Sequence, residues 1–200
     1  MGPGAVCVGG LNLETNQNIR LYGPGGMKLP LDVKFNVGQI WDMEFHERSR
    51  LIPPHVEDVI VDRAEFICQQ GSIYEFLMQR IQPWIGGPEA LFGGFLTSYK
   101  KSAYISQKWS LPNCSVGFWL PNMPLKRTKI PRYYVVDVSP DVWDEVGLHT
   151  KELMIPYKGF SSMLHHIHAG TLLRVSLARW YQPDEADEAG CCLQLSGWYL

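Results

Sequence analysis

The sequence lacks a membrane-spanning signal, because none of its 200 residues fall in an apolar run of about 18 residues. It also lacks the features of a signal peptide. The N-terminus, Met-Gly-Pro-Gly-Ala-Val-Cys, has neither a basic start nor a long apolar segment. We therefore expect a cytoplasmic protein without a membrane partner.

The sequence also lacks the spacings of common cysteine and catalytic motifs. The number of cysteines is odd, no Cys-x-x-Cys occurs, and the last two cysteines are adjacent. The five are Cys7, Cys68, Cys114, Cys191 and Cys192. This usage favours reduced, buried thiols in the cytoplasm. Phosphate-binding Gly-rich loops, Gly-x-Ser-x-Gly and His-Glu-x-x-His are absent. The sequence accordingly nominates no catalytic residue, no metal site and no cofactor.

Long helical patterns are rare, whereas short β patterns are frequent. The chain is 46% hydrophobic and contains 14 prolines, 19 glycines and many aromatic residues, a composition that favours turns and strands. Strands are predicted at residues 6–13, 19–22, 39–50, 59–67, 115–120, 132–138, 171–181 and 191–199. In the segment 39–50, Trp41, Met43 and Phe45 alternate with Asp42, Glu44 and His46.

One segment has a convincing helical pattern. Ser72 and Glu75 form a potential capping box, and apolar residues recur at helical spacing through Trp84. Glycines at 86–87 and 93–94 then indicate a flexible boundary. We predict a mainly β protein with two small OB-like antiparallel barrels and a connecting helix at 72–84. The first barrel and the helix would occupy residues 1–90, and the second barrel residues 91–200.

The densest unusual chemistry lies in the sequence Pro-Pro-His-Val-Glu-Asp at residues 53–58, which we call the elbow. Two prolines end the preceding strand, and three ionisable side chains follow before a new β pattern begins. Three interpretations remain open for His55, Glu57 and Asp58. In the first, Asp58 or Glu57 pairs with Arg20 and His55 caps the backbone of the elbow. In the second, the three residues recognise a ligand together with Arg20, and in the third they act as acid or base groups in catalysis.

Several segments resemble one family. Cys7-Val-Gly-Gly, Asn18-Ile-Arg-Leu, Gly38-Gln-Ile-Trp, the elbow and the C-terminal Leu-Gln-Leu-Ser-Gly-Trp-Tyr at 193–199 are similar to bacterial dual OB-fold domain proteins, which are largely uncharacterised. The resemblance implies two OB-like barrels and a role in nucleic-acid transactions or defence. It implies no established reaction. Related chains carry a further apolar strand before the first of these segments, so either the first barrel is incomplete or the sequence begins late.

The charge distribution nominates a second candidate site. No Asp or Glu occurs from residue 90 to 136, although the net charge of the whole chain is −2. Seven cations lie in that segment among aromatic residues: Lys100, Lys101, Lys108, Lys126, Arg127, Lys129 and Arg132. Single-strand binders combine cations for phosphates with rings for bases. The alternative is a core of aromatic residues with solvated lysines. The acidic loop 184–188 could also neutralise this segment.

Two further groups of residues are candidates for a binding site. Arg174, Trp180 and Trp198 are predicted to share one face of the last hairpin and to form a second stacking platform. His165, His166 and His168 are predicted to lie in a short helical turn at 161–169. Because only His165 and His168 would share a helix face there, a polar surface turn is favoured over a metal site.

The sequence thus predicts a non-enzymatic module that binds single-stranded DNA or RNA through the basic aromatic segment. The first alternative is a protein-interaction or scaffolding module of a bacterial system. The second is an enzyme centred on Arg20, His55, Glu57 and Asp58. Neither the ligand nor the oligomeric state follows from the sequence.

Overall fold

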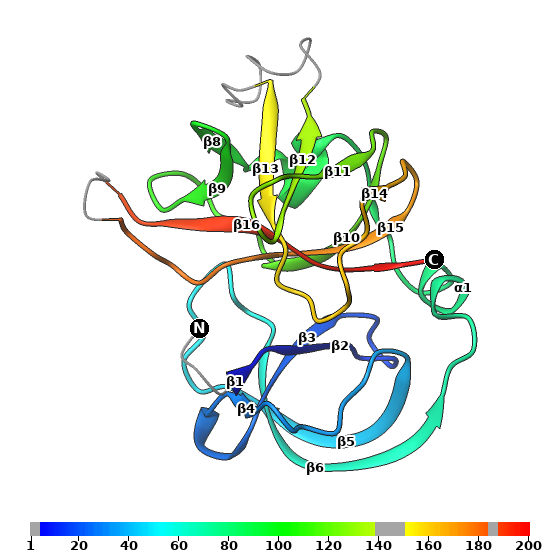
Figure 1. Ribbon diagram of the computed structural model, residues 1–200. Helices are drawn as coiled ribbons and strands as arrows, with labels where there is room; N and C mark the ends of the chain where they lie inside the picture. Colours follow the sequence, from blue (N-terminus) through cyan, green and yellow to red (C-terminus); the bar gives the residue numbers. More distant parts are fainter. Residues whose placement is uncertain (1–4, 139–150, 184–187) are drawn as a thin grey trace. The chain divides into compact units, whose positions relative to one another are not determined.

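The computed structural model describes residues 5–138, 151–183 and 188–200, and strands dominate these ranges (Figure 1). The chain divides into two compact units, residues 1–81 and 82–200. The mainly β prediction is confirmed. The predicted boundary, after residue 90, lies within the second of these units. In the described ranges, no helix is both long enough and apolar enough to cross a membrane.

The first unit contains a curled four-stranded sheet in the order β2-β3-β6-β5 and a small β1-β4 pair. Its neighbouring strands are antiparallel except β3 and β6, which are parallel. A 3-10 turn, η1, follows β3. The strands are β1 (Ala5–Val6), β2 (Val8–Leu11), β3 (Asn18–Tyr22), β4 (Leu29–Pro30), β5 (Gln39–Glu47) and β6 (Asp58–Gln69), and η1 spans Pro24–Gly26.

The predicted alternation in β5 is confirmed. Asp42, Glu44 and His46 are exposed, whereas the apolar residues between them are partly buried. Met43 and Phe45 pack against a small core formed by Val6, Leu21, Leu29 and Val59. The elbow lies between β5 and the start of β6, so these two long strands position it.

The helix α1 (Ile73–Met78) is shorter than the predicted helix 72–84, and Ser72 makes no side-chain capping hydrogen bond. The capping box and the helical position of Trp84 are therefore wrong. Trp84 instead begins β7 (Trp84–Gly86), which runs parallel to β10 and places Trp84 opposite Trp119. Pairing with a buried strand outweighs the local helical pattern in this segment.

The second unit contains two sheets. The larger has the order β7-β10-β15-β16-β9-β8, and the smaller has the order β13-β12-β11-β14. A 3-10 segment, η2 (Pro88–Gly94), follows β7. The remaining strands are β8 (Thr97–Tyr99), β9 (Ser102–Ser106), β10 (Val116–Pro121), β11 (Leu125–Arg127), β12 (Tyr133–Asp137), β13 (Glu152–Pro156), β14 (His166–Ile167), β15 (Leu172–Leu177) and β16 (Gly190–Tyr199).

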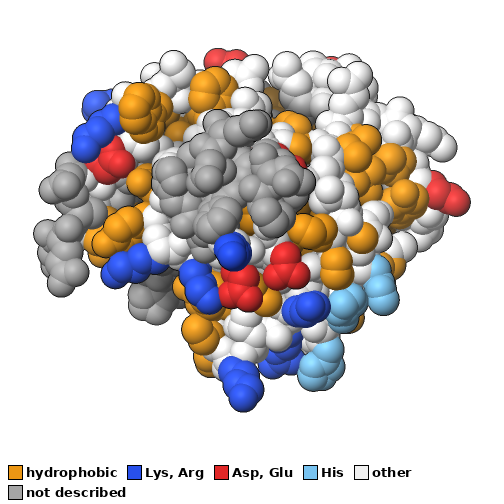
Figure 2. All heavy atoms as spheres, turned by 90° about the horizontal axis from the view of Figure 1, so that it is seen from above, with side chains coloured by type: hydrophobic (Ala, Val, Ile, Leu, Met, Phe, Trp, Pro, Cys, Tyr) orange, Lys and Arg blue, Asp and Glu red, His pale blue; other side chains and the backbone are white. Residues whose placement is uncertain are grey.

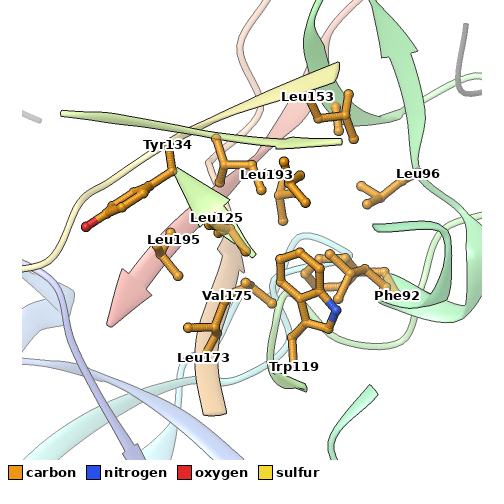
Figure 3. Close-up of a cluster of buried hydrophobic side chains, with 14 of the residues drawn as sticks. Phe92, Leu96, Trp119, Leu125, Tyr134, Leu153, Leu173, Val175, Leu193 and Leu195 are labelled. Atoms are coloured by element: carbon orange, nitrogen blue, oxygen red, sulfur yellow. The ribbon is translucent and has the colours of Figure 1, made fainter. Parts of the chain in front are cut away.

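The second unit is built around a large apolar core to which both sheets contribute. Figure 3 shows side chains from β10, β11, β12, β13, β15 and β16 pointing toward one another around Trp119. Trp119 is fully buried, and its indole Nε1 donates to the carbonyl of Gly86 at 2.9 Å. Gly117 lies beneath Trp84, and a Cβ there would be 2.2 Å from the Trp84 ring. A glycine is therefore required where β7 packs on β10.

Two other predictions have different outcomes. The final hairpin is confirmed by the antiparallel pairing of β15 with β16. The helical turn at 161–169 is wrong, because His166–Ile167 forms β14 and pairs antiparallel with β11. Residues 184–187 of the acidic loop lie outside the described residues.

Candidate nucleic-acid interface

The elbow is tied to the first sheet through its backbone. The amide of Arg20 donates to the carbonyl of Glu57 at 2.7 Å, and the amide of Arg48 donates to the carbonyl of Asp58 at 3.2 Å. The amide of His55 closes a turn onto the carbonyl of Ile52. These bonds fix the elbow between β3 and the end of β5, where β6 begins.

A buried ion-pair cluster lies at this junction. The carboxylate of Asp58 is 3.3 Å from Arg20 Nη1 and 3.6 Å from Arg48 Nη1. The guanidinium of Arg48 also lies over the Tyr22 ring, 4.8 Å from its centroid. Asp58 is 2% exposed and Arg20 is 8% exposed. Asp58 therefore pairs with Arg20, which is one of the two pairings that the first interpretation of the elbow allowed.

His55 and Glu57 are also buried, so all four residues of the predicted cluster lie in the interior of the first unit. Charges that are removed from water in this way need close partners. The geometry favours an ionic brace for the elbow over an open catalytic pocket. A ligand-binding role for the four residues stays a prediction.

Three of the seven cations in the basic segment are engaged by the protein itself. Lys101 pairs with Glu152 at 2.7 Å, and Lys108 pairs with Glu188 at 3.5 Å. Arg132 donates to the carbonyls of Tyr157 and Gly159 and lies over the Tyr157 ring. These contacts make the three side chains poor candidates for phosphate contacts.

The other four cations are exposed: Lys100, Lys126, Arg127 and Lys129. Lys100 lies over the Tyr99 ring, with Nζ 5.2 Å from the centroid. Within the ranges that the structure describes, none of the four forms a salt bridge. Lys126, Arg127 and Lys129 fall on β11 and the turn after it, so three of the four come from one short segment.

The pairing register shows which way this segment faces. Leu125 lies opposite Ile167, and both are buried. The next pair, Lys126 and His166, must therefore point away from the core, because successive side chains of a strand alternate between faces. Lys126 is paired with Val135 on β12, and Val135 is paired with Met154 on β13, so these side chains lie on the same side of the sheet. We call this side of the β13-β12-β11-β14 sheet the outer face.

The outer face carries charge toward one edge and apolar groups toward the other. His166 lies on the edge strand β14 and Lys126 on its neighbour β11, and Val135 and Met154 follow on β12 and on the other edge strand, β13. Tyr133 lies opposite Pro156 on the same side of the sheet and is partly exposed. A base could thus contact rings and aliphatic groups while its phosphates reach the cations.

Two carboxylates mark one end of the outer face, where Asp137 lies opposite Glu152. The hydrogen bond and charge of Lys101 lower the pKa of Glu152, so this carboxylate is neutralised locally. Asp137 is exposed. Figure 2 shows Lys and Arg side chains near His side chains, with Asp and Glu side chains beside them. A bound polyanion would therefore favour the end of the face away from Asp137.

The predicted platform of Arg174, Trp180 and Trp198 is built differently. The Trp198 ring contacts Tyr157 and Tyr134, with centroids 5.0 Å and 6.2 Å away. Both tryptophans are partly buried against the core of the second unit. These rings contribute to packing, and a stacking role for them stays a prediction.

The end of the acidic loop contacts the basic segment. The carboxylate of Glu188 accepts hydrogen bonds from Ser106 Oγ at 2.6 Å and from the Tyr104 hydroxyl at 3.3 Å. The Ser106 bond is the main reason that the pKa of Glu188 is lowered, and Lys108 adds to it. For Glu188, the predicted neutralisation of a cation in the basic segment is therefore observed.

The histidines form a contact pair, with the rings of His166 and His168 4.8 Å apart. Among the described residues, no group of three or more His, Cys, Asp or Glu side chains could hold a metal ion. All five cysteines are free thiols, and only Cys191 is fully buried, so the expectation of generally buried thiols is wrong.

Sequence reasoning missed Val135 and Met154 as part of the candidate surface. The alternation of residues 133–137 predicts a strand. The strand β14, which pairs with β11 on its other side, has only two residues and no strand pattern of its own. Without β14, the outward direction of Lys126 and His166 could not be deduced.

Curled sheets of short, mostly antiparallel strands in both units define a β protein of the OB type. The chain matches the family described as the dual OB-containing domain over residues 1–198, and it belongs to that family. The resemblance stated from the sequence is thereby confirmed. Searches of curated proteins and of solved structures returned no match.

Proposed function

We propose that the second unit binds single-stranded nucleic acid on its outer face. Lys126 contacts backbone phosphate. Lys129, in the turn that follows β11, is a second candidate for this contact. Tyr133, Val135 and Met154 provide the surface on which a base rests. The ligand is DNA or RNA, because nothing in this arrangement selects for the ribose hydroxyl.

One observation carries the proposal: the register places exposed Lys126 and His166 side by side, facing outward, next to an apolar strip. Cations beside exposed apolar or aromatic groups are the combination that single-strand binders use. Sheet faces of OB-folds bind oligonucleotides in other proteins, which supports the choice of ligand. The fold alone does not assign the function, because one fold hosts many.

The proposal is tested by titrating a labelled thymidine oligonucleotide of about ten nucleotides with the protein at several salt concentrations. Affinity should fall steeply between about 50 and 200 mM salt, because phosphate contacts release counterions. Lys126→Ala should weaken binding by about three- to tenfold and reduce the log–log salt slope by about 0.7, the value of one phosphate contact on a single strand.

Lys28→Ala is the matched control, because it removes the same charge from an exposed site in the first unit. It should leave both affinity and salt slope unchanged. Binding that ignores salt, or equal losses in the two variants, would contradict a phosphate contact at Lys126.

A second prediction uses Asp137, an exposed carboxylate that the strand register places on the outer face. Asp137→Asn should strengthen oligonucleotide binding by about two- to fivefold, because it removes repulsion between a carboxylate and the phosphates. The gain should shrink as salt is added. Asp42→Asn, at an exposed position on β5, serves as the control. A loss of affinity in Asp137→Asn would place the ligand on another surface.

The second candidate function is a protein-interaction module. It is favoured by large rings that are well exposed in the second unit, with Trp109 71% and Phe160 79% exposed. This function predicts no affinity for oligonucleotides at low salt. The same titration therefore separates the two candidates.

A further inference from the structure

The function proposed above uses the position of His166 beside Lys126 but assigns no chemistry to the three histidines at 165, 166 and 168. His166 lies directly opposite Lys126 across the β11–β14 pair. The backbone amide of Arg127 donates to the carbonyl of His165 at 3.0 Å, which holds the two segments together. All three histidine side chains are exposed.

The surroundings of this pair are mixed in charge, because Glu152 lies on the same face of the sheet and its carboxylate interacts with the charge of Lys126. On β11 the facing charge is Lys126, whereas Arg127 is paired with buried Tyr134 and falls on the other side of the sheet. On the other side His166 meets the ring of His168. Among the described residues, none of the three histidines forms a salt bridge with a carboxylate, in contrast to His46, which pairs with Asp62 at 2.7 Å.

An imidazole gains a proton and a positive charge in the range from about pH 8 to pH 5. Protonation of His166 and His168 would extend the charge of Lys126 along the edge of the outer face. Without a ligand, these like charges repel one another. A phosphodiester backbone on this edge would remove that repulsion, so ligand binding and protonation should favour each other.

We propose that His166 and His168 are phosphate-binding residues of the outer face and make its affinity for single strands increase as the pH falls. This inference rests on the proposed function. The ligand class is the phosphodiester backbone, because a charge gained on imidazole strengthens contacts to phosphates and not to bases.

The experiment measures binding of the thymidine oligonucleotide at about pH 7.5 and about pH 5.5, at constant ionic strength. Thymine and phosphodiester groups do not change charge over this range. The wild-type protein should bind on the order of tenfold more tightly at the lower pH, because two phosphate contacts gain charge. The variant with His166→Gln and His168→Gln should lose most of this increase.

His46→Gln is the matched control, because His46 is exposed but paired with Asp62 in the first unit. It should keep the wild-type pH dependence. Circular dichroism at both pH values verifies that every variant is folded under the conditions of the titration.

Two negative results have different meanings. Salt-dependent binding with no pH dependence, or with equal pH dependence in the double variant, overturns the role of the histidines and leaves the proposed function standing. An absence of binding at both pH values at low salt overturns the proposed function and this inference with it.

Discussion

Replacing Asp58 by alanine should lower the free energy of unfolding of the first unit by about 3–5 kcal/mol. The carboxylate lies between Arg20 and Arg48, and the side chain of Arg20 is itself only 9% exposed. Removing the carboxylate takes a nearby counter-charge away from a buried guanidinium. The loss should be visible in urea unfolding monitored by circular dichroism.

Glu44→Gln is the control for this variant, because it breaks an ion pair to Arg63 whose two side chains are 65% and 71% exposed. Exposed pairs contribute little, so the change should stay below about 1 kcal/mol. The double variant Arg20→Met and Asp58→Leu should recover a large part of the loss, because neither buried charge then remains. Equal effects of Asp58→Ala and Glu44→Gln would contradict the ionic brace.

The elbow shows what local sequence predicts well. Two prolines followed by charged residues between β patterns were enough to predict a strand break and, as one interpretation, a pairing of Arg20 with either Asp58 or Glu57. The sequence did not reveal Arg48 as the second partner, because nothing near residue 48 marks its side chain for a buried carboxylate. That contact exists only because β5 ends beside the start of β6.

The helix shows where local sequence misleads. Residues 79–84 carry a helical apolar spacing, yet Trp84 pairs opposite Trp119 and rests on Gly117. The partner of Trp84 lies more than 30 residues away in the sequence. Propensity is a weak prior, and a tertiary contact of this size overrides it.

The candidate surface shows the same division. The absence of carboxylates from residue 90 to 136 marked the segment that contains Lys126, but it assigned equal weight to all seven cations. The structure divides them, because Glu152 and Glu188 come from distant segments to pair with Lys101 and Lys108. The prediction of a single basic groove is thereby reduced to Lys126 and its neighbours on β11. Only the strand register, which the sequence does not specify, could separate the two groups.

Replacing Trp119 by alanine should lower the free energy of unfolding of the second unit by about 3–5 kcal/mol. The ring is fully buried, and its loss removes the hydrogen bond that ties Gly86 of β7 to β10. Fluorescence and circular dichroism during urea unfolding measure the change. Trp109→Ala is the control, because its ring is 71% exposed and should contribute within about 0.5 kcal/mol.

The Trp119→Ala variant also tests whether the loss of stability and the binding of the oligonucleotide are independent. Trp119 belongs to the core beneath the sheets, whereas Lys126 points away from that core. Under conditions in which Trp119→Ala remains folded, its oligonucleotide affinity should equal that of the wild-type protein, and binding should be lost only as the second unit unfolds. A folded Trp119→Ala variant with weakened binding at low temperature would show that the ligand contacts the β7–β10 region, and the outer face would no longer be the preferred surface.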